Sequence, residues 1–192
     1  LGRCKGAGPF LEFLDPFLKY NFFTSTNESF KLTFGSKLFY TGMQSSSDLS
    51  SITRFEKFSH RVSYHSELLI AYQIHPKLAI QFSPGFLYRN LTNYNDDNGL
   101  LNLGSVAKIH LFKKVSLMLE HFWIIDNNNF RVDNYSNPFG IGIEINTFAH
   151  VFQLNFMNSK GLGEGQFLPY TSSKWSNGEF RFGFTIARKF NT

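Results

Sequence analysis

The last strand-like stretch of the chain, EFRFGFTIARKF at residues 179–190, alternates between two kinds of side chain. Phe180, Phe182, Phe184 and Ile186 fall on one face, and the residues between them are small or charged. Successive side chains of a strand point to opposite faces of a sheet. Segments of about ten residues that are apolar toward lipid and polar toward a lumen are typical of transmembrane β-barrels. The stretch therefore predicts an all-β, antiparallel transmembrane barrel.

The composition indicates that apolar residues are distributed among polar ones rather than gathered in long runs. Aromatic residues make up 18% of the chain, with 24 Phe, yet the mean hydropathy is only −0.19. No run approaches the roughly 18 consecutive apolar residues that a spanning helix needs, which argues against a helical membrane protein. The length fits one domain over residues 1–192.

The charges and the single cysteine exclude other classes. The net charge is +5 without a long Lys/Arg run, so nucleic-acid binding is disfavoured. A charged lumen or an anionic lipid surface suits this charge better. Cys4 is alone, which excludes an intramolecular disulfide and a CxxC-type metal site. We expect no cofactor.

Alternation bounded by Gly, Asn, Asp, Ser and Pro predicts about nine strands in this chain. They cover residues 15–24, 30–40, 62–74, 78–89, 101–111, 115–125, 141–146, 152–156 and 179–190. Eight apolar residues are expected to face lipid: Phe34, Phe82, Leu119, Ile143, Phe152, Leu154, Phe156 and Phe182. The connections alternate in length. They are tight at 25–28, 75–77, 112–114 and 147–149, and long at 43–57, 93–99, 126–138 and 159–178.

This alternation predicts a topology, because bacterial outer-membrane barrels have short periplasmic turns and long outer loops. With a periplasmic C-terminus, residues 1–14 then lie outside with the long loops. An open sheet edge in hydrocarbon leaves unpaired amides. We therefore expect an odd number of upstream strands, or a second chain, to close the barrel, and this chain to be a C-terminal portion.

Several segments resemble an uncharacterised family of Bacteroidota outer-membrane β-barrels, a domain of unknown function. The segments are His150 to Ser159, Gln166-Phe167, Lys174-Trp175 and Phe180 to Phe184, with Phe17 to Tyr20, Arg61 to Tyr64, Leu68 to Ala71 and Tyr88 to Leu91 upstream. The resemblance implies about twelve strands in the full protein and a location in the bacterial outer membrane. It brings no catalytic residues.

Two other readings compete with a passive membrane barrel. A soluble, lipocalin-like binding barrel also alternates, but its outer face should be rich in Lys, Glu and Asp, whereas here the face opposite the apolar one is rich in Gly, Ser, Ala, Thr and Asn. A lipid-modifying barrel enzyme needs Ser and His side chains that meet. Ser66 follows His65, but neighbouring strand residues point to opposite faces. The six histidines show no HxH or HExxH spacing, so no metal site is expected.

Titratable side chains on the polar face are the candidate lumen residues. They are Lys31, Lys37, Arg61, His65, Glu67, Arg89, Lys108, His110, Glu120, Glu144, Arg181 and Lys189. Either they line a water-filled path that favours anionic solutes, or acidic and basic members pair across the lumen and plug it. The sequence leaves both alternatives open.

The loop at residues 161–178 carries three aromatic residues, Phe167, Tyr170 and Trp175. It either folds into the mouth of the barrel or docks a partner. We therefore expect a porin-like solute channel or a structural, docking subunit of an envelope complex, without catalysis. The expected partners are outer-membrane lipid and lipopolysaccharide, with surface lipoproteins or other envelope subunits.

Overall fold

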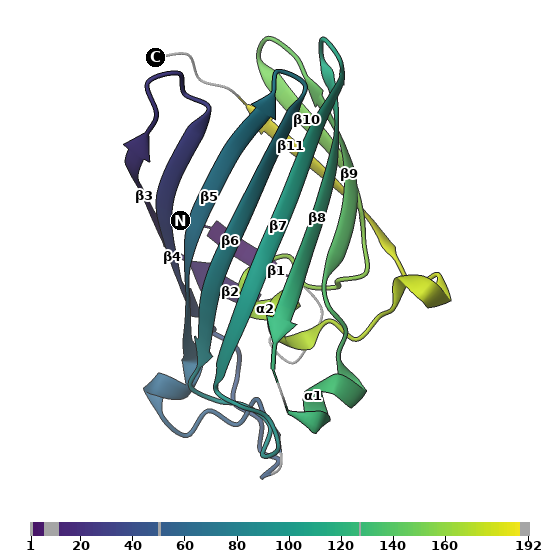
Figure 1. Ribbon diagram of the computed structural model, residues 1–192. Coiled ribbons are helices and arrows are strands. Elements are labelled where there is room, and N and C mark those ends of the chain that lie inside the picture. The colour runs from purple at the N-terminus through teal and green to yellow at the C-terminus, as the bar shows by residue number, and fades with distance from the viewer. Residues whose placement is uncertain (1, 6–11, 50, 127, 189–192) are drawn as a thin grey trace.

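The computed structural model describes residues 2–5, 12–49, 51–126 and 128–188 (Figure 1). These residues form one antiparallel sheet of 11 strands, which confirms the predicted fold class. The strands are β1 (Gly2–Lys5), β2 (Glu12–Asp15), β3 (Phe17–Thr24), β4 (Phe30–Tyr40), β5 (Val62–His75), β6 (Leu78–Arg89), β7 (Gly99–Phe112), β8 (Val115–Ile125), β9 (Phe139–Asn146), β10 (His150–Met157) and β11 (Arg181–Arg188). Four short helices lie in the loops: η1 (Phe58–Arg61), α1 (Asn129–Asn134), α2 (Glu164–Tyr170) and η2 (Trp175–Asn177). No helix in the described residues is long and apolar enough to cross a membrane.

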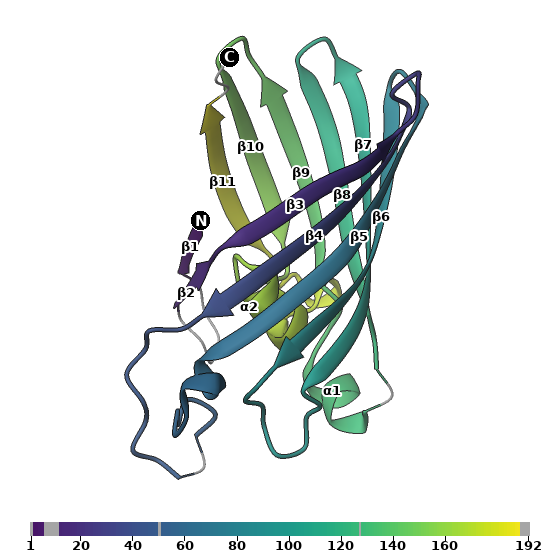
Figure 2. The same ribbon diagram turned by 90° about the vertical axis from the view of Figure 1, so that its left-hand side faces the viewer.

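The sheet follows the order of the chain. Each strand from β4 to β11 pairs with the one before it, and β3 lies beside β4. The sheet curls into a wall around a central space, with β3 and β11 at its two sides (Figure 2). Within the described residues, no hydrogen-bonded ladder joins β11 to β1 or β3.

Two strands were not predicted from the sequence. Residues 2–5 and 12–15 form the antiparallel pair β1–β2, in which Gly2 pairs with Asp15. The pair joins the sheet where Leu14 pairs with Tyr40 of β4. Pro16 separates β2 from β3 because proline has no backbone N–H to continue the ladder. The strands are too short for an alternating pattern to stand out.

The two kinds of connection lie at opposite ends of the sheet, as predicted. The tight turns at residues 25–29, 76–77, 113–114 and 147–149 lie at the top of Figure 1, and the long loops lie at the bottom. The last strand ends at Arg188, and the remainder of the predicted segment, 189–190, lies outside the described residues.

The outer face of the sheet is apolar and exposed. Phe34, Phe82, Ile143, Phe156 and Phe182 have between 39% and 62% of their surface accessible. Leu119, Phe152 and Leu154 alternate in the same register and are half-buried. The inner face instead holds buried polar side chains. This arrangement is the inverse of a soluble protein.

A hydrophobic core fills the inside of the sheet at the loop end. It consists of Phe13, Phe39, Phe55, Leu87, Leu100, Phe122 and Leu168. Most of these residues come from strand ends next to the long loops, and Leu168 comes from α2. The mouth at this end is therefore packed with side chains.

Candidate functional site

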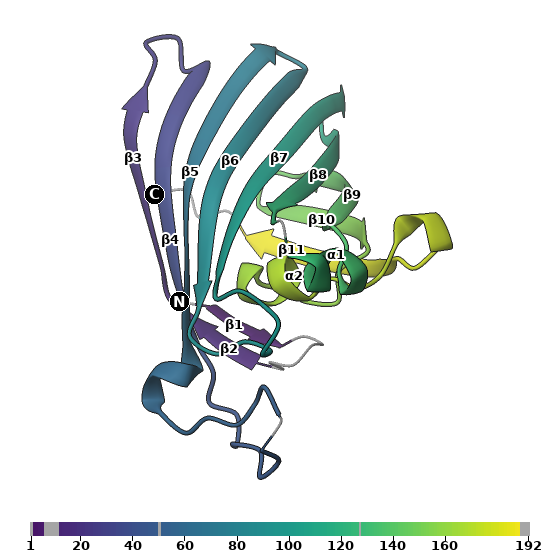
Figure 3. The same ribbon diagram turned by 60° about the horizontal axis from the view of Figure 1, so that its bottom comes forward.

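Helix α2 lies on the concave side of the sheet, between its walls (Figure 3). Leu168 of this helix is 1% exposed in the core, and Phe167 packs on Phe122 of β8 with ring centroids 5.2 Å apart. The backbone at Gly165 touches Phe39 so closely that a Cβ atom would lie 3.0 Å from the ring. Glycine thus allows the helix to sit against β4. We call residues 159–178, which contain α2, the plug segment.

An ion pair ties the plug segment to the wall. The Lys37 ammonium on β4 donates to the Glu164 carboxylate in the first turn of α2. The side-chain oxygen of Gln166 accepts from the backbone N–H of Leu162 at 3.1 Å, which holds the start of the helix. Lys37 and Glu164 are 127 residues apart in the chain, so this contact is purely tertiary.

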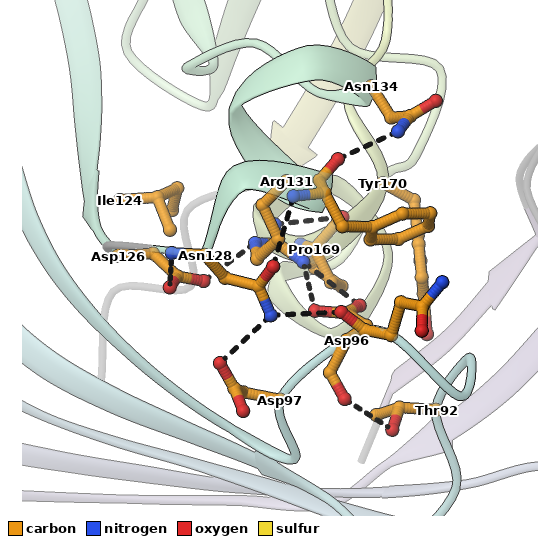
Figure 4. Close-up of polar contacts among 12 residues, drawn as sticks. Thr92, Asp96, Asp97, Ile124, Asp126, Asn128, Arg131, Asn134, Pro169 and Tyr170 are labelled. Carbon is orange, nitrogen blue, oxygen red and sulfur yellow. Dashed lines mark hydrogen bonds and ion pairs between the residues drawn. The ribbon is translucent and has the colours of Figure 1, made fainter.

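A buried charge network connects the plug segment to two other long loops (Figure 4). The Asp96 carboxylate accepts from Arg89 Nη1 at 2.9 Å and from Arg131 Nη1 at 3.1 Å. Arg131 also donates through Nη2 to the carbonyl of Pro169 at 3.0 Å, and its Nε lies 3.1 Å from Asp126. The Asp96 side chain is 0% exposed.

The network is balanced in charge, with two guanidinium groups facing two carboxylates. Arg89 ends β6, Asp96 lies in the β6–β7 loop, Arg131 lies on α1, and Asp126 follows β8. A buried charge without a partner is costly, so the four groups are held in one arrangement. The Arg131 bond to the Pro169 carbonyl fastens α2 to this arrangement. We call Arg89, Asp96, Asp126 and Arg131 the latch.

Tyr170 completes the contact between α2 and the latch. Its hydroxyl oxygen lies 3.4 Å from Arg89 Nη1, and the Arg89 guanidinium lies 5.5 Å from its ring centroid. Burial raises the pKa of the Tyr170 hydroxyl above its ordinary value. The hydroxyl therefore stays protonated at neutral pH and adds no negative charge beside Asp96.

The remaining lumen is lined by small polar clusters. His65 Nε2 lies 3.2 Å from Asn102 Nδ2, and Gly85 makes room because a Cβ there would lie 2.7 Å from the imidazole. Nearer the tight turns, Lys108 donates to Glu144 at 2.6 Å, and Gln153 donates to the same carboxylate at 3.0 Å.

A cavity of about 510 Å³ adjoins the plug segment on the side of β8–β11. Glu120, Asn155 and Arg181 contribute polar groups to its wall, and Phe122 and Phe167 contribute apolar surface. The mixed lining is compatible with water and small polar solutes, and residues of the plug segment form part of the wall.

The comparison with protein families decides the class of the molecule. The model of the membrane-bound β-barrel domain family DUF5777 matches residues 5–190. The chain belongs to this family. Neither a curated protein nor a solved structure matches the chain.

The DUF5777 barrel therefore has a membrane location and the predicted fold, and the family has no described function.

In the described part of the chain, no three His, Cys, Asp or Glu side chains are placed to hold a metal ion. His110 Nδ1 lies 2.8 Å from Ser116 Oγ, a distance that a nucleophile and its base require. However, Ser116 is 3% exposed, and the nearby Glu144 carboxylate binds Lys108 and Gln153.

The acidic side chains of the loops, rather than those of the strands, pair with several predicted lumen residues. Lys37 binds Glu164, and Arg89 binds Asp96. Only Glu144 among the predicted strand acids forms an ion pair in the described structure, with Lys108.

Three other candidates lie at the ends of the barrel. Arg61 is in η1, and it donates to the loop carbonyls of Thr41 and Met43 and covers the Phe55 ring. Lys31 lies by a tight turn, 3.6 Å from Glu28. Arg181 donates to the carbonyl of Asn158 at 3.1 Å and to Ser173 Oγ at 3.0 Å. Lys189 lies outside the described residues.

The aromatic residues of the predicted docking loop pack within the chain itself. Phe167 contacts Phe122, and Tyr170 contacts the latch. Trp175 donates through Nε1 to the carbonyl of Phe139 at 2.9 Å and stacks on Phe180 at 5.1 Å. All three are half-buried.

The latch residues Asp96, Asp126 and Arg131 were missed because they lie in loops without a motif. The apolar residues that face inward could be recognised in part from the sequence, because they interrupt the alternating pattern. Phe39 and Leu87 each stand between two other apolar residues, so that both faces of the strand become apolar next to a long loop. This departure from alternation marks a packed mouth.

Proposed function

We propose that this DUF5777 barrel is an integral outer-membrane protein without intrinsic catalysis, and that its lumen is a path for small solutes closed at rest by the plug segment. The observation that carries the proposal is the position of α2 on the concave side of the sheet. It is held there by the Lys37–Glu164 ion pair and by the latch.

The inner wall supports a solute path because it is polar at both sides of the plug segment. Arg181, Asn155 and Glu120 line the cavity beside α2, while a second cavity of about 350 Å³ beside β3–β5 is lined by Lys37, His65 and other residues. Charged side chains that line a pore set its ion preference. The plug segment is a loop, and loops of this kind move more readily than strands.

Glu164→Lys should open the path. The substitution removes the partner of Lys37 and places two positive charges side by side, which repel each other in a half-buried site. We expect the open probability in planar bilayers to rise about tenfold, the effect of about 1.4 kcal/mol. Single-channel recording of the purified protein measures it.

Asp133→Lys is the matched control, since it makes the same charge change on an exposed residue of α1. It should leave conductance as in the parent protein. If neither protein conducts ions under any voltage, the solute-path proposal is wrong, and a structural role takes its place.

The outer-membrane location has its own test. In a cell that expresses the full-length gene, the protein should sediment with outer-membrane markers on a sucrose gradient and stay in the membrane after carbonate washing, because a band of apolar strand residues faces lipid. Release of folded protein by carbonate, or its recovery with inner-membrane markers, would contradict the proposal.

A docking subunit is the second candidate, and the long loops favour it. They expose large apolar side chains: Leu49, Phe58, Tyr94, Val132 and Leu162. Tyr94 in particular is fully exposed. A barrel that conducts no ions but retains a partner after mild detergent extraction would have this role.

A further inference from the structure

The four tight turns form one continuous rim at the end of the barrel opposite the plug segment. The backbone N–H of Gln73 donates to the carbonyl of Ser29 at 2.7 Å, and that of His110 donates to Lys77 at 2.8 Å. Asn146 donates in the same way to Lys114 at 2.7 Å. The first three turns are thus each bonded to a neighbouring strand. We call residues 24–31, 72–78, 110–115, 146–150 and 187–188 the turn rim.

The turn rim is strongly basic. It contains five Lys or Arg residues and one acidic residue, Glu28, which gives a formal charge of +4. The long loops at residues 41–61, 90–98, 126–138 and 158–180 contain eight acidic and six basic residues, which gives −2. The two ends of the barrel therefore differ in the sign of their formal charge.

Three of the rim cations are available for binding. Lys77, Lys113 and Lys114 are exposed, and in the described structure their ammonium groups form no hydrogen bond or ion pair. Glu28 lies 3.6 Å from Lys31, which leaves it away from these lysines.

Exposed apolar side chains stand next to the lysines. Phe112 is 73% exposed, Phe148 is 88% exposed and Ile74 is 52% exposed. Aromatic residues are typical of the membrane–water interface, where an apolar ring enters the acyl region. A lysine beside such a ring extends to the level of the headgroups.

We propose that the turn rim binds the phosphate groups of anionic phospholipids, through Lys77, Lys113 and Lys114, in the membrane leaflet that the tight turns face. The charge complementarity selects anionic over zwitterionic lipid, and the neighbouring apolar side chains place the ammonium groups at headgroup depth. The inference rests on the transmembrane placement in the proposed function, but not on conduction of solutes.

Lipid selectivity in reconstituted vesicles tests the proposal. The full chain is reconstituted in phosphatidylcholine vesicles, and electron spin resonance measures its association with spin-labelled phosphatidylglycerol relative to spin-labelled phosphatidylcholine. We expect preference for phosphatidylglycerol that falls as salt is raised. In the triple variant Lys77→Gln, Lys113→Gln, Lys114→Gln the preference should fall by about fivefold for each lysine that contacts a headgroup.

The matched control is Lys57→Gln, Lys160→Gln, Lys174→Gln, which removes three exposed lysines from the long loops and should keep the preference. Equal losses in both triple variants, or no loss in either, would overturn the proposal. So would a rim-dependent affinity for acidic polypeptide in place of lipid, or displacement of the labelled lipid by inorganic phosphate at constant ionic strength.

The shift in gel mobility on heating reports insertion separately. Failure of the parent protein to insert counts against the proposed function, whereas normal insertion without lipid preference counts against the rim alone. If the triple variant does not insert, the single variants Lys113→Gln and Lys114→Gln should each show a partial loss.

Discussion

Asp96→Asn should destabilise the protein by about 3 to 5 kcal/mol, the usual cost of breaking a buried ion pair by removing one partner. Asp96 is the shared acceptor of Arg89 and Arg131, and its side chain has no exposed surface. The neutral amide keeps the volume but leaves a buried net positive charge in the latch. Denaturant unfolding in lipid vesicles measures the change in free energy.

The same variant should loosen the plug segment, because Arg131 holds the Pro169 carbonyl and is itself positioned by Asp96. We expect faster proteolysis within residues 159–178 and a higher open probability in planar bilayers. Asp97→Asn is the control, since Asp97 is exposed and its carboxylate accepts only a 3.2 Å bond from Asn128 among the bonds described. Its effect should stay within about 0.5 kcal/mol. Equal destabilisation by both variants would show that the latch does not depend on the buried charge.

Phe82→Arg should destabilise the protein folded in vesicles, lowering its free energy of unfolding by about 2 to 4 kcal/mol. This is the cost of an arginine on the lipid face near the middle of a membrane. Phe82 lies on the outer face of β6 and is 44% exposed. Its neighbour Gln81 pairs with Ala71 and Val106 on the inner face and is half-buried. Gln81→Arg therefore places the same side chain on the same strand, but toward the lumen.

The two variants place the same side chain on opposite faces of β6, so the difference between their free energies of unfolding reports the environment of each face. In a lumen that holds polar groups, Gln81→Arg should cost about 1 kcal/mol or less. A soluble barrel would give the opposite order, because Phe82→Arg would then put a charge into water. That order would contradict the assignment of the outer face to lipid. Folding efficiency into vesicles, followed by the heat-dependent shift in gel mobility, gives the measurement.

The strand faces and the two kinds of connection followed from the sequence because they depend on local properties. Phe180, Phe182 and Phe184 share a face since side chains alternate along any strand. The turn at His75-Pro76-Lys77 is short because a hairpin needs few residues, and the paired strands β5 and β6 then place Ile80 opposite Tyr72. These relations hold whatever the loops do.

The short pair β1–β2 did not follow from the sequence, since four-residue strands carry too few alternations to be recognised. β2 meets the main sheet at one position, where Leu14 pairs with Tyr40 of β4. The inward Phe39 likewise could be understood only once α2 was placed against it.

The sequence by itself determined the longer strands β3 to β11, their apolar and polar faces and the two ends of the barrel, because each of these is a repeating local pattern. Only the tertiary structure decided which charged groups meet on the concave side of the sheet. Lys37 meets Glu164 across 127 residues, and Asp96 meets Arg131 across 35. These pairs come from loops without periodicity, and buried charges select their partners by three-dimensional proximity rather than by spacing along the chain.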